Sequence, residues 1–530
     1  MSTLKSEHIE ASGRLNDLVS ARFASRLAAG DHTLWGAEAE AEAAKRLGWI
    51  NPSRTDPQLL DRIEALRDEL HAAGITRVLL AGMGGSSLAP EVIATAVGAP
   101  LTVLDATSPG QVRRAIEAAV ADSAIVISSK SGSTIETDSA LRASVAMLTE
   151  QGIDPRERIV VITDPGSDLS ALAAEAGYRL FHADPKVGGR FSALTAFGLV
   201  PAGLAGCDIR RLVADATAAQ TLIGTDEPGN PALALAAALT DPDRPAIGLL
   251  AETPEVAGLP DWIEQLVAES TGKLGRGLLP VPLHEGAPEV TNPPRDLQLV
   301  RLTGEVAAGH TEDGAPPARV TVEGATTRVA APLGAQFLIW EAAVVAAGRL
   351  LGINPFDQPD VEAAKIAARQ LLSDGSRPAD GGAGVAPSAP EGGAVALAAL
   401  LAQLPANGYV AIQAYCDRAL LPGATELRDE LAARTGRPVT FGWGPRFLHS
   451  TGQYHKGGPR AGVFLQLVEH ADEDLQIPGL PFSFGELLRA QAAGDARVLA
   501  EHGMPVATIV LRGGAAQIAK TIANLRGDAA

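Results

Sequence analysis

Strand-like and helix-like segments alternate along this chain, and the alternation restricts the possible fold more than any other feature of the sequence. Alanine-rich stretches such as 111–121 and 138–151 separate short runs of aliphatic and β-branched residues. Alternation at this spacing is typical of right-handed βαβ units, whose strands are parallel. We therefore predict an α/β protein with a doubly wound parallel sheet. The first region contains five expected strands, at 77–81, 101–105, 124–128, 158–163 and 178–181.

A second α/β region begins near residue 246. We divide the chain into an N-terminal helical segment, 1–70, a first domain, 71–225, and a second domain, 226–530. The segment 373–393 is rich in Gly, Pro, Ala and Ser, which predicts a flexible linker within the second domain. Further strands are expected at 246–251, 409–413, 438–441, 463–468 and 506–511, and helices at 259–269, 333–351 and 361–372.

Composition excludes several classes of protein. The 530 residues carry a net charge of −18, which argues against non-specific binding of nucleic acid or of an anionic membrane. Two cysteines, Cys207 and Cys416, exclude a disulfide framework and a multi-cysteine zinc site. The N-terminus lacks the pattern of a signal peptide, so we expect a cytoplasmic protein. The apolar stretch 333–351 contains Glu341 and Arg349, and we expect a buried helix rather than a membrane span.

A glycine-rich turn follows the first expected strand. Gly84, Gly85 and Ser86 would let the backbone approach an anion at the start of the next helix. A tight strand–helix connection explains this turn equally well. Asp105 at the end of the next strand would suit a nicotinamide-dependent enzyme, but Ser87 replaces the third glycine of the dinucleotide-binding pattern.

A second loop, after the third expected strand, is rich in hydroxyl groups. It contains Ser129, Lys130, Ser131 and Thr134. These residues could simply cap a helix, but one hydroxyl suffices for a cap, so we favour anion binding. The carboxyl ends of parallel strands lie at one edge of a sheet, so both loops could hold the same phosphate group. The residues alone therefore predict an α/β protein that binds a phosphorylated small molecule.

Five segments together resemble the glucose-6-phosphate isomerase family, in particular the isomerase portion of transaldolase–isomerase fusions. They run in the family's order from Gly82 to Lys365: GMGGSSLAP, SKSGSTIET, VGGRFS, ESTGK and NPFDQPDVEAAK. That family has two sugar-isomerase (SIS) domains with flavodoxin-like sheets. The resemblance thus implies two such domains here, each a mostly parallel sheet flanked by helices.

The resemblance also implies a role for individual residues. Glu269 would be the base that moves a proton between C2 and C1 of the sugar, and Arg190 would stabilise charge on the enediol. Lys365 would assist ring opening. The remaining implied contacts to the sugar phosphate come from Gly84, Gly85, Ser86, Ser129, Lys130, Ser131, Thr134, Gln265 and Gln358.

The ring-opening histidine departs from the family's order, in which it lies between the glutamate and the lysine. Here the matching motif, HSTGQ, follows Lys365. His449 in this motif is the first candidate and His455 the second. His284 lies nearer the usual position but has no matching motif.

The activity implied by the resemblance is reversible isomerisation of glucose 6-phosphate and fructose 6-phosphate through a cis-enediol. A positioned base and preorganised positive charge suffice for this reaction, so we expect neither a cofactor nor a metal ion. Mannose 6-phosphate could be a further substrate, or the chain could be a non-catalytic sugar-phosphate sensor. Glu269, Arg190 and Lys365 together favour catalysis. The resemblance further implies a homodimer in glycolysis and gluconeogenesis, without nucleic-acid or membrane partners.

Overall fold

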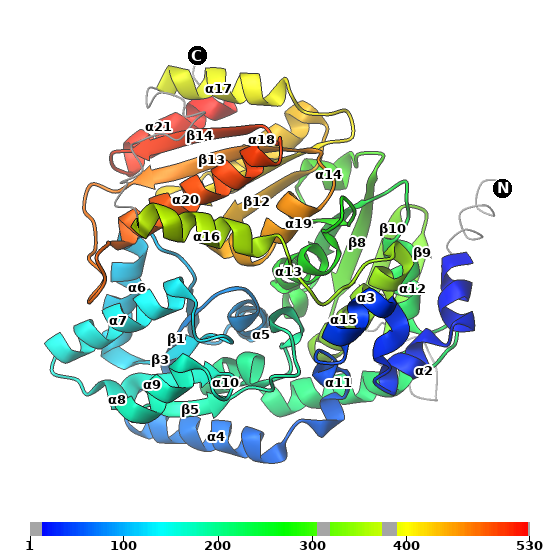
Figure 1. Cartoon of the computed structure of the whole chain (residues 1–530), viewed down its shortest axis with the longest axis horizontal. Coiled ribbons are helices and arrows are strands. Elements are labelled where there is room, and N and C mark those ends of the chain that lie inside the picture. The colour runs from blue at the N-terminus through cyan, green and yellow to red at the C-terminus, as the bar shows by residue number, and fades with distance from the viewer. Residues whose placement is uncertain (1–12, 305–317, 374–389, 528–530) are drawn as a thin grey trace.

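The computed structural model describes residues 13–304, 318–373 and 390–527, except the side chains of residues 362–365, 373, 390 and 391. The predicted linker 373–393 therefore lies mostly outside the described residues. Three sheets, each flanked by helices, form the body of the molecule (Figure 1). The predicted α/β class, with parallel sheets flanked by helices, is confirmed.

The first sheet has the order β2-β1-β3-β4-β5, and all its strands are parallel. Every residue of β3 and β4 is buried, because helices cover both faces and leave no side of these strands to water. The strands are β1 (Arg77–Gly82), β2 (Leu101–Leu104), β3 (Ser123–Ser128), β4 (Ile159–Thr163) and β5 (Arg179–His182), and the helices are η4 (Gly84–Ser86), α5 (Leu88–Val97), α6 (Pro109–Asp122), α7 (Ile135–Glu150), α8 (Pro155–Arg158), α9 (Asp168–Ala176), η5 (Gly189–Phe191) and α10 (Ala196–Leu204).

Helices also make up the chain before the first sheet, as the sequence predicts. A short 3-10 helix begins at Pro52, where the Asn51–Pro52 pair interrupts the α-helices. The elements are α2 (Phe23–Ala28), η1 (His32–Trp35), α3 (Ala37–Ala43), η2 (Gly48–Ile50), η3 (Pro52–Arg54) and α4 (Pro57–Ala72).

The second sheet has the order β7-β6-β8-β10-β9, with only the β10–β9 pair antiparallel. Its strands are β6 (Ala246–Ala251), β7 (Leu279–Leu283), β8 (Leu297–Thr303), β9 (Arg319–Glu323) and β10 (Thr326–Ala330). Around it lie α11 (Ile209–Ile223), α12 (Pro231–Leu239), η6 (Pro254–Val256), α13 (Leu259–Thr271), α14 (Pro288–Thr291) and α15 (Leu333–Leu351).

A separate third sheet follows, with the order β12-β11-β13-β14 and parallel strands throughout. The expectation of one sheet for residues 226–530 is therefore wrong. Periodicity identifies strands, but their pairing is decided between segments far apart along the chain. The elements are α16 (Val361–Ser373), α17 (Pro390–Leu401), β11 (Tyr409–Tyr415), η7 (Arg418–Leu420), α18 (Ala424–Thr435), β12 (Val439–Trp443), η8 (Arg446–His449), α19 (Gly452–Gly457), β13 (Gly462–His470), α20 (Phe484–Glu501), β14 (Val506–Arg512) and α21 (Ala515–Arg526).

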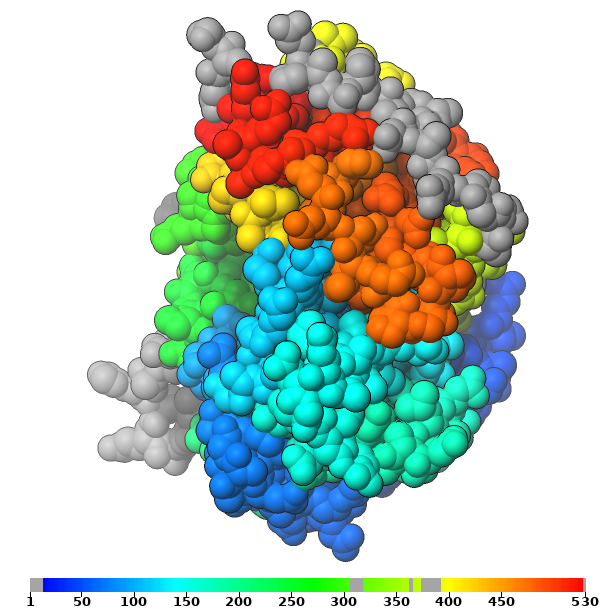
Figure 2. All heavy atoms as spheres, turned by 90° about the vertical axis from the view of Figure 1, so that its left-hand side faces the viewer, coloured from blue at the N-terminus to red at the C-terminus, as the bar shows by residue number. Residues whose placement is uncertain are grey.

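The region of the third sheet packs directly on the region of the first sheet, although more than 200 residues separate them along the chain. Figure 2 shows the orange C-terminal segments seated on the cyan and blue segments of the first sheet. Ion pairs such as Arg114–Asp417, 2.6 Å between Nη2 and Oδ2, join the two regions. Residues of the C-terminal region can therefore reach the carboxyl edge of the first sheet.

Helix α15 is the one helix among the described residues that is long and apolar enough to cross a membrane. However, 89% of its apolar window is buried inside the protein. Trp35 in η1 donates a hydrogen bond of 2.8 Å to the Val345 carbonyl oxygen, which attaches the N-terminal helices to α15. The sequence expectation of a buried helix at 333–351 is confirmed.

Candidate functional site

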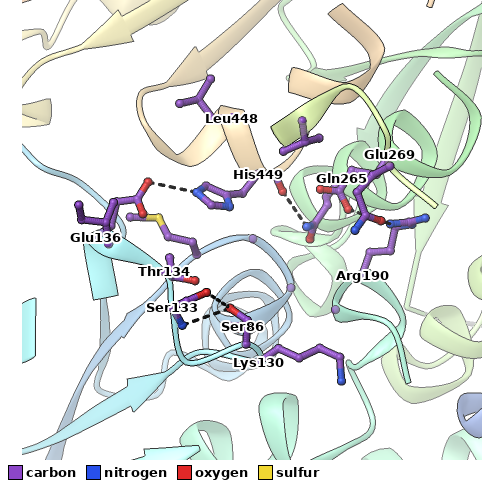
Figure 3. Close-up of a pocket in the computed structure, with 18 of the residues that line it drawn as sticks. Ser86, Lys130, Ser133, Thr134, Glu136, Arg190, Gln265, Glu269, Leu448 and His449 are labelled. Carbon is purple, nitrogen blue, oxygen red and sulfur yellow. Dashed lines mark hydrogen bonds and ion pairs between the residues drawn. The ribbon is translucent and has the colours of Figure 1, made fainter. Parts of the chain in front are cut away.

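A cavity of about 630 Å³ lies at the carboxyl ends of β1 and β3. Loops of the first region form its floor, α13 and the segment after α15 form one wall, and η8 and α20 form another (Figure 3). Because the cavity draws on all three regions, residues that are far apart in the sequence meet in it.

The glycine-rich turn after β1 approaches its neighbours so closely that side chains would not fit. Gly84 has a φ of +55°, and a Cβ atom there would lie 2.7 Å from the carbonyl oxygen of His449. A Cβ at Gly85 would lie 2.0 Å from the carbonyl oxygen of Gly189. These glycines let the turn, the Arg190 loop and the His449 loop meet at one point. Gly84, Gly85 and Ser86 all line the cavity.

The hydroxyl-rich loop after β3 runs along the same floor. Ser131 and Thr134 line the cavity, whereas Ser129 is buried behind them and donates a hydrogen bond of 3.1 Å to the Thr134 hydroxyl. Thr134 precedes α7, but its side chain makes no capping bond. Helix capping therefore does not explain Thr134, and its hydroxyl hydrogen stays available to a ligand. Lys130 also lines the cavity and pairs with Asp164, 2.6 Å away.

Glu269 and Arg190 face the cavity from the opposite wall (Figure 3). Glu269 is in the last turn of α13, four residues after Gln265, and both residues line the cavity as that spacing predicts. Arg190 Nη1 lies 3.2 Å from Glu269 Oε2 and donates a 2.8 Å hydrogen bond to Gln358 Oε1. Glu269 is 8% exposed and Arg190 is 4% exposed. This wall therefore presents a carboxylate and a guanidinium that are largely shielded from water.

The segment around Gln358 is fixed by two buried cations. Arg190 Nη2 donates to the carbonyl oxygens of Pro355 and Asp357, at 2.7 and 3.2 Å. Lys273 Nζ donates to the Asp357 carbonyl oxygen and carboxylate, at 2.6 and 2.7 Å. Burial and the nearby Arg190 lower the pKa of Lys273 to about 8. Lys273, from the ESTGK segment, thus fixes the backbone that positions Gln358 against Arg190.

His449 lies on the other side of the cavity, at the end of η8 (Figure 3). Its Nε2 is 3.2 Å from Glu136 Oε1, and the amide of Gln491 donates 2.8 Å to the same carboxylate oxygen. The side-chain nitrogen of Gln265 donates 2.7 Å to the carbonyl oxygen of His449. The imidazole is therefore oriented by a carboxylate, and its backbone is attached to α13.

The other candidate histidines lie elsewhere. His455 is 2% exposed and outside the cavity lining; its Nδ1 is 3.0 Å from the Tyr409 hydroxyl. Burial lowers the pKa of His455 to about 3. His284 is on the surface, 2.7 Å from Asp429, and also outside this cavity. Lys365 lies outside the residues whose side chains are described.

Asp105, considered above as a dinucleotide ligand, is fully occupied by protein cations. Its carboxylate accepts from Arg418 and Arg446, at 2.5 and 2.7 Å, and those arginines hold its pKa below the usual range. Arg446 begins η8 and also pairs with Glu91, 2.6 Å away, so this network fixes the loop that carries His449. A dinucleotide site at this turn would need Asp105 as a free acidic residue, but Asp105 is already paired with two arginines.

Two residues of the site, Glu136 and Gln491, were not predicted from the sequence. Glu136 is part of the SKSGSTIET segment, where an acidic residue in the first turn of a helix has an ordinary explanation in the helix dipole. No local signal distinguishes Gln491, which reaches Glu136 only through the packing of α20. Among the described residues no group of three or more His, Cys, Asp or Glu side chains could hold a metal ion. The expectation of a metal-free, cofactor-free site stays a prediction.

The fold and the cavity define an α/β protein with a polar cavity, which presents a carboxylate and a guanidinium on one side and an imidazole on the other. Comparison with known sequences is more specific. A probable glucose-6-phosphate isomerase of Natronomonas pharaonis is 29% identical over 389 residues, covering 64% of this chain and 88% of that protein. A glucose-6-phosphate isomerase of Thermus thermophilus is 28% identical over 386 residues, covering 63% and 91%. No family model matches the chain.

Solved structures give a consistent comparison. A hypothetical protein from Thermus thermophilus aligns with a TM-score of 0.57 and 26% identity, covering 69% of this chain and 97% of that one. A glucose-6-phosphate isomerase from Chlamydia trachomatis aligns with a TM-score of 0.52 and 17% identity, covering 66% and 79%, which is a likeness of fold alone. The chain is thus similar to glucose-6-phosphate isomerases over about two thirds of its length, and the finer resemblance to transaldolase–isomerase fusions stays a prediction.

Proposed function

We propose that this protein is a glucose-6-phosphate isomerase, which interconverts glucose 6-phosphate and fructose 6-phosphate through a cis-enediol with Glu269 as the base. One observation carries the proposal: a shielded carboxylate, paired with a guanidinium, faces the same cavity as two loops suited to a phosphate group. The similarity to curated isomerases supports it.

The phosphate group would lie on the floor of the cavity. Ser86, Ser131 and Thr134 offer hydroxyl donors there, and the N-terminus of α7 offers backbone N–H groups and a favourable dipole. Lys130 adds positive charge, balanced in part by Asp164. A phosphate held here would place the sugar between the Glu269 wall and the His449 wall.

Proton transfer would take place at the Glu269 wall. The carboxylate would remove the proton from C2, leaving an enediolate, and return it to C1 as the proton on O2 passes to O1. Arg190 is suited to stabilise the negative oxygen of that intermediate, because its guanidinium is fixed by five hydrogen bonds and needs little reorganisation. Arg190 Nη1 lies 3.2 Å from Glu269 Oε2, so the guanidinium stands directly beside the proposed base.

Ring opening would take place at the opposite wall. An imidazole can donate and accept a proton near neutral pH, and the Glu136 carboxylate fixes the orientation of His449. For Lys365 we retain the role that the resemblance implies, which is to assist ring opening. The two walls thus divide the chemistry between ring opening and isomerisation.

The test is direct. Purified protein is supplied with fructose 6-phosphate, and glucose 6-phosphate formation is followed with a coupled dehydrogenase. We expect turnover. Tight binding of the sugar phosphate without turnover would contradict the proposal and favour a sensor, and faster formation of mannose 6-phosphate would contradict the assigned substrate pair.

A further inference from the structure

A second cavity, of about 380 Å³, shares no lining residue with the candidate active site. It lies between α13, β7, β12 and η8, where the three regions of the chain meet. Two carboxyl groups one helical turn apart on α13, Asp261 and Glu264, line it.

Glu264 is the unusual residue of this cavity. It is 9% exposed, and among the described residues none forms a hydrogen bond or an ion pair with it. Burial raises the pKa of Glu264 well above its usual value. A largely buried carboxyl group without a protein partner needs one from outside the protein, and the cavity gives water or a ligand access to Glu264.

The arginines that line this cavity already have carboxylate partners. Arg446 pairs with Glu91 and Asp105, and Arg418 pairs with Asp105 as well. Two cations thus face two anions. The third, Arg428, pairs with Glu289 and Asp429. Arg446 acts electrostatically on both Asp261 and Glu264, but among the described residues neither carboxyl group forms an ion pair, which favours a positively charged ligand over an anion.

Part of the cavity lining is aromatic. Phe441 and Trp443 are half-buried and meet edge to face, with ring centroids 4.9 Å apart. The Arg418 guanidinium already lies over the Trp443 ring, 5.6 Å from its centroid, so this wall accommodates a cation. Aromatic rings and carboxyl groups in one cavity suit the methylene groups and charge of an organic cation. A hydrated divalent metal ion would gain nothing from those rings.

We propose that this cavity binds a small organic cation of the alkylammonium class, whose nitrogen is held by Glu264 and Asp261 and whose carbon chain packs against Phe441 and Trp443. The inference is independent of the proposed isomerase activity, because no residue of the candidate active site lines this cavity.

Calorimetry with 1,4-diaminobutane at fixed ionic strength tests the proposal on the full-length protein. We expect saturable binding at one site per chain, and no binding of the uncharged 1,4-butanediol. A hydrogen bond to a charged group contributes enough that Glu264→Gln and Asp261→Asn should each weaken binding by about tenfold or more. If Glu264→Gln folds poorly, Asp261→Asn still tests the proposal, because Asp261 is exposed.

The matched control is Glu285→Gln, which removes an exposed carboxylate beside the cavity that does not line it. Unchanged affinity in this variant supports a specific site. If Glu285→Gln weakens diamine binding as much as the cavity variants do, the binding reflects only general attraction to a chain of net charge −18. That result would overturn the proposal. Binding of Mg²⁺ without binding of the diamine would also overturn it.

Discussion

His449 and His455 belong to one short segment, HSTGQYH, yet their surroundings are opposite. His449 borders the large cavity, where its Nε2 lies 3.2 Å from the Oε1 atom of a buried residue, Glu136. His455 is enclosed by aromatic rings, stacked 5.8 Å from Tyr409 and edge-on to Phe464 at 5.1 Å. One imidazole faces the cavity, where we propose that it transfers a proton, and the other is a neutral part of the core.

The difference arises from the backbone between the two residues. The 3-10 helix η8 ends at His449, and α19 begins at Gly452, so the chain turns between them. Helix α19 then directs His455 away from the cavity and toward β11 and β13. Two histidines six residues apart therefore differ in chemistry because of their neighbours in space, which the motif alone does not specify.

The largest expected difference between the two histidines is in their effect on turnover. His449→Ala should lower turnover of cyclic fructose 6-phosphate by about 10²-fold or more, because a positioned acid–base group would be lost. An open-chain substrate analogue should lose much less, since it needs no ring opening. His284→Ala, at a surface histidine outside the cavity, is the control. Equal losses on both substrates would remove His449 from ring opening.

A smaller effect is expected for substitutions at the floor of the cavity, which should change substrate binding rather than proton transfer. Ser131→Ala and Thr134→Ala should each weaken sugar-phosphate binding by about tenfold, because each removes a hydroxyl donor to a charged group. Calorimetry measures the affinity. Thr149→Ala, at the far end of α7, should leave it unchanged. If both floor variants bind normally, the phosphate lies elsewhere.

His455 should affect stability rather than turnover. Its pKa is about 3 in the folded protein and about 6.5 unfolded, so between these values the unfolded chain binds the extra proton. Stability should therefore fall as pH drops below 6.5, by up to about 1.4 kcal/mol per pH unit from this residue. His455→Phe should remove that slope in urea unfolding measured from about pH 7 to about pH 4.5. Parallel pH profiles for the two proteins would contradict the buried, neutral assignment.

The smallest expected effect is that of metal removal. The ring of His449 has a carboxylate partner and that of His455 a hydroxyl partner. Exhaustive treatment with EDTA should therefore leave the isomerase rate unchanged. Activity that disappears and returns on addition of a divalent ion would show that the proton-transfer site is incomplete as described.

Much of the fold follows from the sequence where burial is continuous. Strands such as β3 and β4 are unbroken apolar runs, and the sequence locates them within a residue or so. Strand β9, RVTVE, was not predicted, because it is a short, polar edge strand with no buried residue. Strand β7, LPVPL, contains two prolines, which favour other structures. The third sheet was missed because strand pairing is not local.

The sequence predicted the loops of the candidate site and the Gln265–Glu269 spacing on α13. Residues 84–86 and 131–134 follow strands directly, so their meeting at one edge follows from parallel topology. Glu136 and Gln491 act through contacts across 355 positions of sequence. The position of His449 depends on how the third sheet seats on the first, which no local pattern records.

Glu269→Gln tests the central claim most directly, because it keeps the shape of the side chain and removes the base. Two quantities are measured together: turnover of fructose 6-phosphate, and exchange of the C2 proton of glucose 6-phosphate with solvent by NMR. We predict that both fall by at least about 10²-fold while sugar-phosphate affinity stays near normal. Near-normal turnover and exchange in Glu269→Gln would contradict the account, because the carboxylate facing Arg190 would then not carry the proton.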